Sequence, residues 1–574
     1  MGQTIDQAFT GDPLLGTEAE SSDDVHWWQR TLPSILALTI VLFLLAQLTD
    51  PAGYLSTDVG GKTATIEVII EDGPRAPDLG YWAEEFDEDG SLYPMWSTGK
   101  VGDSWVNVTT LPMLYVAVPL WKLGGPRLAV LIPVLGTVLA AAGAAALAAR
   151  IGGDRRQRSM AFWLVGLASP ATIYALDFWE HSLGLALITW GMVLALDAGS
   201  DQRIRWWVPL AAGLAFSGAA SMRQEALIYG VVAGVVLVGR LTVGAKPLTA
   251  VLRGGAMIIG TGLGLAANAA FEWWVFDTTL RAGRGGSTAA AAGTDLMVRL
   301  EEAVVTGVAP MAGTNGSALL VAGLLFALLV ALGVKADAPA TEQRMIWAGL
   351  AAVAALTVLD LLIDGLRFVP GMAATTPLAV FGLARGLRRG PARAVTAMAL
   401  AALPVVWMTQ FAGGASAQWG GRYILPSGLL LLVVAVVTYD TGRAHETMRK
   451  VAVAGLAITI VGLAWAIVRT HGVADAGRVL ADRPEDALLF HDPFLAREPG
   501  PLGLDERWLA APTAALVAEA GEVLAAAGVE RVGYVDYDIG REVPDIPGYV
   551  PVGESTIGLV NDLRLRIVTF ERTS

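Results

Sequence analysis

Side chains that can transfer protons interrupt an otherwise apolar part of this chain. The stretch Ser169 to Leu187, which reads SPATIYALDFWEHSLGLAL, carries Asp177, Glu180 and His181 between two apolar runs. Carboxylates and imidazoles are the usual general acids and bases. A carboxylate at bilayer depth costs about 2.5 to 3.5 kcal/mol on insertion scales, so such groups are usually paired, hydrated or functional. The alternative is a short turn in headgroup water, with Trp179 as an interfacial anchor.

Further polar candidates stand at the ends of other apolar runs. Arg223 and Glu225 occur in MRQEA, Arg422 and Tyr423 in WGGRY, and Asp58 in STDVGGK. A guanidinium offers two parallel donors to phosphate oxygens, and a carboxylate can deprotonate a hydroxyl. Structural alternatives remain open, because Asp58 could cap the helix that follows it and Glu225 could merely orient Arg223.

Composition places these residues in a membrane protein. Of 574 residues, 54% are hydrophobic and 16% are charged, against about 25% charged in soluble domains. The net charge of −13 comes largely from long loops and terminal segments and argues against a nucleic-acid partner. The chain has no cysteine, so disulfides, thiolate chemistry and Cys-ligated metals are excluded.

The elements that must position the polar residues are transmembrane helices, about thirteen of them, in a mainly α membrane domain over residues 31–469. The apolar runs lie at 31–49, 127–150, 159–177, 181–198, 206–222, 225–240, 254–275, 316–334, 345–363, 371–388, 394–412, 423–440 and 450–468. Residues 1–30 are expected to form a disordered cytoplasmic tail, because they lack the basic region of a signal peptide.

Basic residues in the short loops predict the orientation. Eighteen of them fall in one set of loops, and only Arg223, Arg367 and Arg422 fall in the other. Because cytoplasmic loops are enriched in Lys and Arg, the first set is expected inside, and the three exceptions are expected outside. They could bind an anionic ligand, or they could contact lipid headgroups or pair with acids. The eighteen are Arg150, Arg155, Arg156, Arg158, Arg203, Arg205, Arg240, Lys246, Arg253, Lys335, Arg344, Arg385, Arg388, Arg389, Arg393, Arg443, Arg449 and Lys450.

Two long external loops are expected. In the first, residues 50–126, the pair Gly60 and Gly61 is interpreted as a tight turn before a surface helix over Lys62 to Ile70. The apolar stretch Leu111 to Leu123 predicts a second interfacial or re-entrant helix. The Gly-, Ala- and Thr-rich segment Phe276 to Ser317 predicts a mobile loop over the substrate.

The hydropathy changes near residue 470, and a small external α/β domain is expected over residues 470–574. Strand-like runs occur at 487–490, 531–535 and 563–570, and a helix-like run occurs at 512–527 with its proline in the first turn. The segment contains neither a phosphate-binding loop nor metal-ligand spacing. It predicts a capping role or a role in binding the second substrate.

These motifs resemble the GT-C superfamily of integral-membrane glycosyltransferases, which includes protein O-mannosyltransferases, aminoarabinose transferases and arabinofuranosyltransferases. The resemblance covers about residues 31–440. It rests on the first-loop acid Asp58, the two surface helices, FWEHS, MRQEA and WGGRY with Trp419. It implies a polyprenyl-phosphate sugar donor, an external site in the plasma membrane, inversion at the anomeric carbon and Asp58 as general base. The acceptor would be a glycan, lipid or protein hydroxyl.

Metal dependence stays open. Members of this superfamily can carry two adjacent acids in the first loop, whereas Thr57 and Val59 flank Asp58 here. Glu180 and His181 could position the acceptor or hold a divalent cation with Asp58, since imidazole with carboxylates is acceptable ligation. A hydrogen-bonded structural role for the histidine is equally compatible with the sequence.

Other interpretations compete with these. Asp360, Asp364 and Arg367 flank one external turn, and their spacing favours a self-satisfied helical ion pair over a site. The main rival function is a transporter or a lipid-linked-sugar flippase. Such proteins often show internal repeats and charges near the bilayer midplane, and neither is evident here. A ligase or polymerase that uses a diphosphate lipid, and a non-catalytic scaffold, are further alternatives.

Overall fold

The computed structural model divides the chain into two compact units, each described by itself. The helical unit comprises Met1–Leu44, Ile132–Asn268 and Ala282–Leu463, and the sheet unit comprises Leu45–Leu131, Ala269–Arg281 and Ala464–Ser574. The structure describes residues 27–107, 111–200, 204–280, 296–307, 344, 347–349, 351, 352, 354, 355, 358, 362, 370–387, 390–409, 419–439, 443–560 and 563–573. The predicted run 316–334 and the triplet Asp360, Asp364 and Arg367 lie outside these residues.

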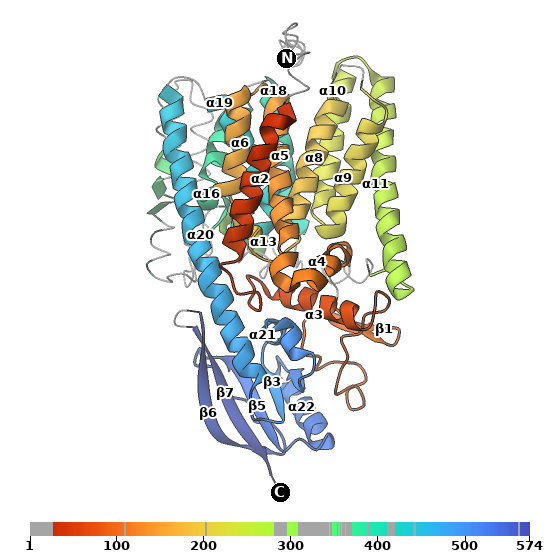
Figure 1. Cartoon of the computed structure of the whole chain (residues 1–574), viewed down its shortest axis with the longest axis vertical. Coiled ribbons are helices and arrows are strands. Elements are labelled where there is room, and N and C mark those ends of the chain that lie inside the picture. The colour runs from red at the N-terminus through yellow and green to blue at the C-terminus, as the bar shows by residue number, and fades with distance from the viewer. Residues whose placement is uncertain are drawn as a thin grey trace. The chain divides into compact units, whose positions relative to one another are not determined.

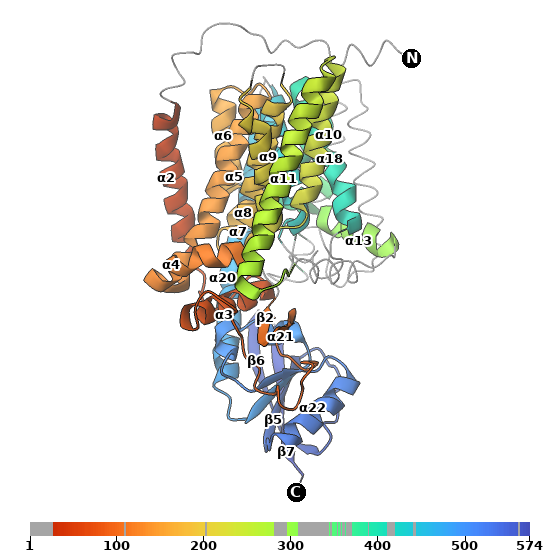
Figure 2. The same ribbon diagram turned by 90° about the vertical axis from the view of Figure 1, so that its right-hand side faces the viewer.

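Long helices lie side by side in the helical unit (Figures 1 and 2). Six described helices are long and apolar enough to cross a membrane, so the chain is an integral membrane protein. The predicted count of about thirteen spans is not confirmed by these residues. The helices with part or all of their length in this unit are α2 (Trp27–Ala46), α5 (Leu131–Arg150), α6 (Arg155–Leu167), α7 (Pro170–Tyr174), α8 (His181–Ala198), α9 (Trp207–Met222), α10 (Ala226–Val243), α11 (Pro247–Phe276), α13 (Leu296–Gly307), α16 (Met372–Thr375), α17 (Pro377–Gly386), α18 (Gly390–Thr409), α19 (Leu425–Tyr439) and α20 (Arg443–Ala481).

Prolines break two of the predicted runs. The run predicted at 159–177 ends as α6 at Leu167, and the short α7 follows with Pro170 in its first turn. The run predicted at 371–388 divides into α16 and α17 before Pro377. Proline lacks the backbone N–H that continues a helix and disfavours helical backbone in the preceding residue. The prediction of one uninterrupted helix was therefore wrong in both places.

Part of the second long loop predicted from the sequence is helical. Helix α13 lies within the segment that was expected to be a structureless loop. Arg299 of this helix is buried, and its Nη1 donates to the carbonyl of Trp407 over 3.1 Å. Residues 281–295, including Arg281 and Arg284, lie outside the described part of the chain.

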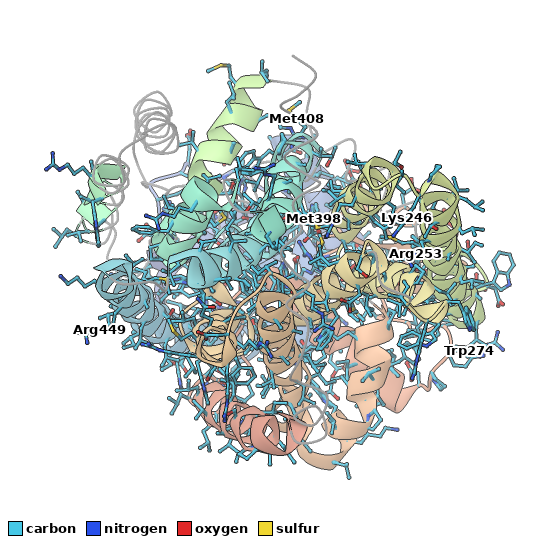
Figure 3. All side chains as sticks on the ribbon, turned by 90° about the horizontal axis from the view of Figure 1, so that it is seen from above. Lys246, Arg253, Trp274, Met398, Met408 and Arg449 are labelled. Carbon is cyan, nitrogen blue, oxygen red and sulfur yellow. The ribbon has the colours of Figure 1, made fainter. Side chains whose placement is uncertain are left out.

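The described basic loops gather at one end of the helical unit, because consecutive helices alternate in direction. Helices α5 and α10 end at the same side at which α6 and α11 begin (Figures 1 and 2). Figure 3 looks onto this side, where Lys246 and Arg253 lie close to each other near the start of α11 and Arg449 lies near the start of α20. The loop between α9 and α10, which carries Arg223 and Glu225, lies at the opposite end (Figure 1).

Close packing of α17 against α19 leads to a first prediction. A Cβ atom added to Gly382 would lie 1.9 Å from the carbonyl oxygen of Leu431. We expect Gly382→Ala to lower the free energy of unfolding by about 1 to 3 kcal/mol, because helix backbones must separate. Thermal unfolding in detergent would measure the change. Gly239→Ala in α10 is the control, since its Cβ would meet no atom within 4 Å; equal stability of the two variants would contradict the prediction.

The sheet unit contains a five-stranded mixed sheet in the order β4-β3-β5-β7-β6. Strand β3 pairs in parallel with β4 and β5, whereas β7 is antiparallel to β5 and β6. The three predicted strands are confirmed, and β4 and β6 were missed. Helix α22 (Ala514–Ala526) begins after its N-cap Thr513, so Pro512 precedes the helix instead of opening it. The strands are β3 (Ala487–Phe490), β4 (Trp508–Ala510), β5 (Arg531–Tyr537), β6 (Tyr549–Val560) and β7 (Leu563–Arg572).

Alternating strand residues build a separate core on each face of this sheet. Leu489, Tyr534 and Phe570 pack on one face with α22, together with Leu92 of the first loop. Strand residues of the other core pack with the end of α20 and with α21 (Pro493–Arg497); they include Leu488, Phe490, Val535 and Ile567. The backbone N–H of Ala510 in β4 donates to the carbonyl of Leu92 over 2.9 Å. The first loop thus contributes to the core of the C-terminal sheet.

The rest of the first loop holds two helices and a hairpin. They are α3 (Thr57–Glu71), α4 (Leu111–Ala129), β1 (Thr98–Val101) and β2 (Ser104–Asn107). Helix α3 starts five residues earlier than predicted, so Gly60 and Gly61 lie inside the helix and the predicted turn was wrong. Helix α4 extends the predicted stretch, with a kink at Gly124 and Gly125, where Gly125 has φ of 64°. The membrane-surface position of both helices stays a prediction.

A partly buried ion pair in the sheet unit predicts a pH dependence of stability. Arg469 Nη2 lies 2.8 Å from Glu498 Oε1. Burial raises the pKa of the Glu498 carboxyl above its ordinary value of 4.5, and Arg469 offsets part of that rise. Because the pKa of Glu498 is raised in the folded protein, the protonated carboxyl stabilises the fold at pH values below its ordinary pKa. This contribution to the free energy of unfolding is lost as pH rises through the raised pKa.

We therefore expect Glu498→Gln, which resembles the protonated acid, to gain stability relative to the wild type as pH rises. The Tm of Glu498→Gln relative to that of the wild type should therefore rise as pH rises above about 4.5. Thermal unfolding at several pH values measures it. Glu554→Gln is the control, because Arg566 lowers the pKa of that exposed carboxyl and the pH trend should have the opposite sign. A pH-independent difference for Glu498→Gln would contradict the prediction.

Candidate functional site

Three loops of the helical unit bring most of the predicted site residues together. Glu180 and His181 lie at the start of α8, which follows the short α7. Arg223 ends α9 in an extended conformation, and Glu225 immediately precedes α10. Arg422 opens a 3-10 turn (Arg422–Ile424) before α19. Breaks between helices leave these side chains at helix ends, where backbone direction can change.

Arg223 is the centre of a buried ionic group. Its Nε lies 2.9 Å from Glu225 Oε1, and its Nη1 lies 3.2 Å from Glu180 Oε1. His181 Nδ1 lies 4.0 Å from the same oxygen of Glu180. The exposed fractions are 4% for Glu180, 8% for Arg223 and 2% for Glu225. Because the guanidinium bridges two carboxylates, the interpretation that Glu225 orients Arg223 agrees with the geometry.

The absence of a side chain at Gly184 allows Arg223 to pack against α8. A Cβ atom on Gly184 of α8 would lie 2.8 Å from Arg223 Cγ. Helices α8 and α9 therefore approach closely at this end, and the arginine side chain fills the space beside the glycine. The spacing of Glu180 and Gly184, one helical turn apart, places both next to the α9 end.

Aromatic rings enclose the ionic group. His181 stacks on Tyr174 with ring centroids 4.9 Å apart and meets the Trp179 ring at 4.2 Å. The Tyr174 hydroxyl donates to the Trp419 carbonyl over 2.9 Å. The Arg223 guanidinium lies 4.7 Å from the centroid of the Tyr423 ring. The predicted Trp anchor is thus a buried part of the group, with Trp179 2% exposed.

Arg422 contacts the same aromatic side chains. Its guanidinium carbon lies 4.9 Å from the Tyr423 ring and 6.0 Å from the Trp179 ring, and Nη2 donates to the Tyr423 hydroxyl over 3.2 Å. Gly420 and Gly421 precede it with φ of 75° and 69°. Glycine adopts this left-handed backbone without strain. The two glycines of WGGRY therefore set the backbone direction just before Arg422.

Several buried polar atoms of this group have no hydrogen-bond partner among the residues that the structure describes. They are Trp179 Nε1, Arg223 Nη2 and Glu225 Oε2. A buried polar atom that lacks a partner costs about 1 to 3 kcal/mol. Two donors and one carboxylate acceptor at one place match a ligand that carries both anionic oxygens and hydroxyl groups.

Asp177 takes a more local part. It is 6% exposed, and its Oδ1 accepts from the backbone N–H of Phe178 over 2.7 Å. This bond helps to shape the turn between α7 and α8. Among the residues that the structure describes, no group of three or more acidic or histidine side chains could hold a metal ion.

Asp58 belongs to the sheet unit. Its Oδ1 lies 3.2 Å from Arg497 Nη1, and the Asp58 side chain is 29% exposed. The N-cap of α3 is Ser56, whose hydroxyl accepts from the Asp58 backbone N–H. The alternative that Asp58 caps this helix is therefore contradicted. Sequence reasoning missed Arg497, because 439 positions separate it from Asp58 and no motif surrounds it.

Comparison with protein-family models and with curated proteins finds no match. Among solved structures, the chain is similar to the archaeal oligosaccharyltransferase AglB from Archaeoglobus fulgidus in complex with an inhibitory peptide and a dolichol-phosphate. The TM-score is 0.45 at 11% identity, over 88% of this chain and 70% of that chain. It is also similar to ArnT from Cupriavidus metallidurans bound to undecaprenyl phosphate, with a TM-score of 0.46 at 13% identity over 94% of this chain and 97% of that chain.

Proposed function

We propose that this protein is a membrane glycosyltransferase that moves a sugar from a polyprenyl-phosphate donor to an acceptor hydroxyl. The observation that carries the proposal is the buried ionic group around Arg223, with its partnerless Trp179 Nε1, Arg223 Nη2 and Glu225 Oε2 among the described residues. A sugar phosphate supplies the phosphate oxygens for the two donors and a hydroxyl for the carboxylate.

Arg422 and Arg223 are assigned to the donor phosphate. Departure of the sugar leaves negative charge on that phosphate, and a guanidinium already in place stabilises the charge as it develops. Glu180 and Glu225 fix the orientation of Arg223, as the distances of 3.2 and 2.9 Å indicate. His181 and Trp179 form an aromatic wall beside the sugar. A divalent metal stays open as an additional requirement.

Asp58 is assigned as the general base. The aspartate removes the proton of the acceptor hydroxyl while the hydroxyl oxygen attacks the anomeric carbon and the bond to phosphate breaks, which inverts the configuration. The Asp58 side chain is 29% exposed, which permits contact with a substrate. In the proposed orientation the N-terminus lies in the cytoplasm, and the active site and the C-terminal sheet lie outside. The basis is the set of basic loops, because loops enriched in Lys and Arg are usually cytoplasmic.

A transfer assay with purified protein in detergent tests this function. The donors are radiolabelled polyprenyl-phosphate mannose, arabinose and glucose, with lipid, glycan and peptide acceptors and with or without Mg²⁺ or Mn²⁺. Sugar transfer or donor hydrolysis by one of these combinations supports the proposal. Movement of a lipid-linked sugar across proteoliposome bilayers without transfer would instead establish the flippase.

A further inference from the structure

We propose that Arg497 of the C-terminal segment is a positioning residue for Asp58. The inference rests on the proposed function, in which Asp58 is the general base. The guanidinium makes one bond to each of two side chains from the first loop: Nη1 to Asp58 Oδ1 at 3.2 Å and Nη2 to Asn107 Oδ1 at 2.9 Å. The aspartate is thereby tied to a fixed support.

Burial and further hydrogen bonds hold this support in place. The Arg497 side chain is 3% exposed, whereas Asp58 keeps 29% of its own surface accessible. Asn107 is 1% exposed, and its Nδ2 donates to the Trp96 carbonyl over 3.1 Å and to the Thr98 hydroxyl over 2.9 Å. A buried arginine therefore presents an orienting charge to the carboxylate of a partly exposed aspartate.

The glycine pair of α3 permits this arrangement. A Cβ on Gly60 would lie 2.0 Å from the Arg497 carbonyl oxygen, and a Cβ on Gly61 would lie 2.6 Å from Asn107 Oδ1 and 2.8 Å from Arg497 Nε. Side chains at these two positions would push α21 away from α3. The VGG sequence after Asp58 is explained by this close approach, which the first interpretation as a turn did not anticipate.

A displacement of a catalytic group by about 1 Å can cost about 100-fold in rate. We therefore expect Arg497→Gln to lower kcat by about 100-fold while the KM for the lipid donor changes less than about threefold, because the donor phosphate is bound elsewhere. Arg497→Lys should recover part of the rate by restoring the charge. Asn107→Ala should lower kcat by about tenfold, because it removes the contact of Arg497 with Asn107 while the contact of Arg497 with Asp58 remains.

The decisive measurement is a double-mutant cycle in the transfer assay. If Arg497 acts through Asp58, the double variant Asp58→Asn/Arg497→Gln should be no slower than Asp58→Asn alone. Arg483→Gln is the matched control. Arg483 also pairs with a carboxylate of the sheet unit, Glu485, but it precedes β3, whereas α21 follows that strand.

Additive losses, or a folded Arg497→Gln with kcat within about threefold of the wild type, would overturn the inference. If Arg497→Gln fails to fold, Asn107→Ala and Arg497→Lys decide instead, and unchanged kcat in both would overturn it. Failure of the proposed function gives a different result. If Asp58 is not the base, Asp58→Asn transfers sugar at the wild-type rate. If the protein is not a transferase, the wild type transfers no sugar.

Discussion

Asp58→Asn should lower the rate of sugar transfer by about 100-fold to 10,000-fold, the range that a general base contributes. The amide keeps the size of the side chain and can still accept from Arg497, but it cannot take a proton from the acceptor hydroxyl. The protein should fold normally, because Ser56 and not Asp58 caps α3. The measurement is initial-rate transfer from the donor that supports turnover, at equal amounts of monodisperse protein.

Asp72→Asn is the matched control for this variant. Asp72 is the exposed C-cap residue at the other end of α3, and its backbone N–H bonds to the Val68 carbonyl. It should transfer sugar at the wild-type rate. Retention of more than about a tenth of the wild-type rate by Asp58→Asn would contradict the base assignment, although the protein would remain a glycosyltransferase.

Arg223→Met should have the largest effect on stability. It would leave the Glu180 and Glu225 carboxylates buried without the cation that bridges them. Removal of one partner from a buried ion pair costs about 3 to 5 kcal/mol, because the remaining charge is uncompensated. Denaturant-induced unfolding in detergent micelles measures the loss, and donor binding should fall with it.

Two further variants serve as controls for Arg223→Met. Arg150→Met removes an arginine whose pair with Asp197 is exposed, at 41% and 31% for the two side chains, and should cost about 0 to 1 kcal/mol. The triple variant Glu180→Gln/Arg223→Met/Glu225→Gln removes all three charges, so it should regain most of the stability but bind no donor. If Arg223→Met were as stable as Arg150→Met, the ionic group would not be a structural element of this unit.

The membrane class and most helix positions could be predicted from the sequence, because they depend on local composition. Hydropathy gave α8 with the same bounds as observed, and α9 and α10 within a few residues at each end. The three predicted strands of the C-terminal sheet were found for a similar reason, since alternation and β-branched residues are local signals. Strand β4 was missed because its three residues are too few to show a pattern.

The grouping of the candidate residues was only partly accessible to the sequence. Topology correctly placed Glu180, His181, Arg223 and Arg422 together, because each follows or precedes a helix at the same end of the bundle. Which atoms meet was decided by tertiary packing. The sequence did not show that Arg223 bridges two carboxylates or that Tyr423 lies against both arginines.

By itself the sequence determined that the chain crosses a membrane and that its acids and arginines cluster at helix ends, since apolar length and residue type are properties of short segments. Only the tertiary structure decided that Leu92 of the first loop completes the core of a sheet more than 390 residues later, and that Arg497 holds Asp58. The physical reason is that such contacts depend on where distant backbones approach. The sequence shows two glycines at positions 60 and 61, but only the structure shows that Arg497 of α21 packs against them.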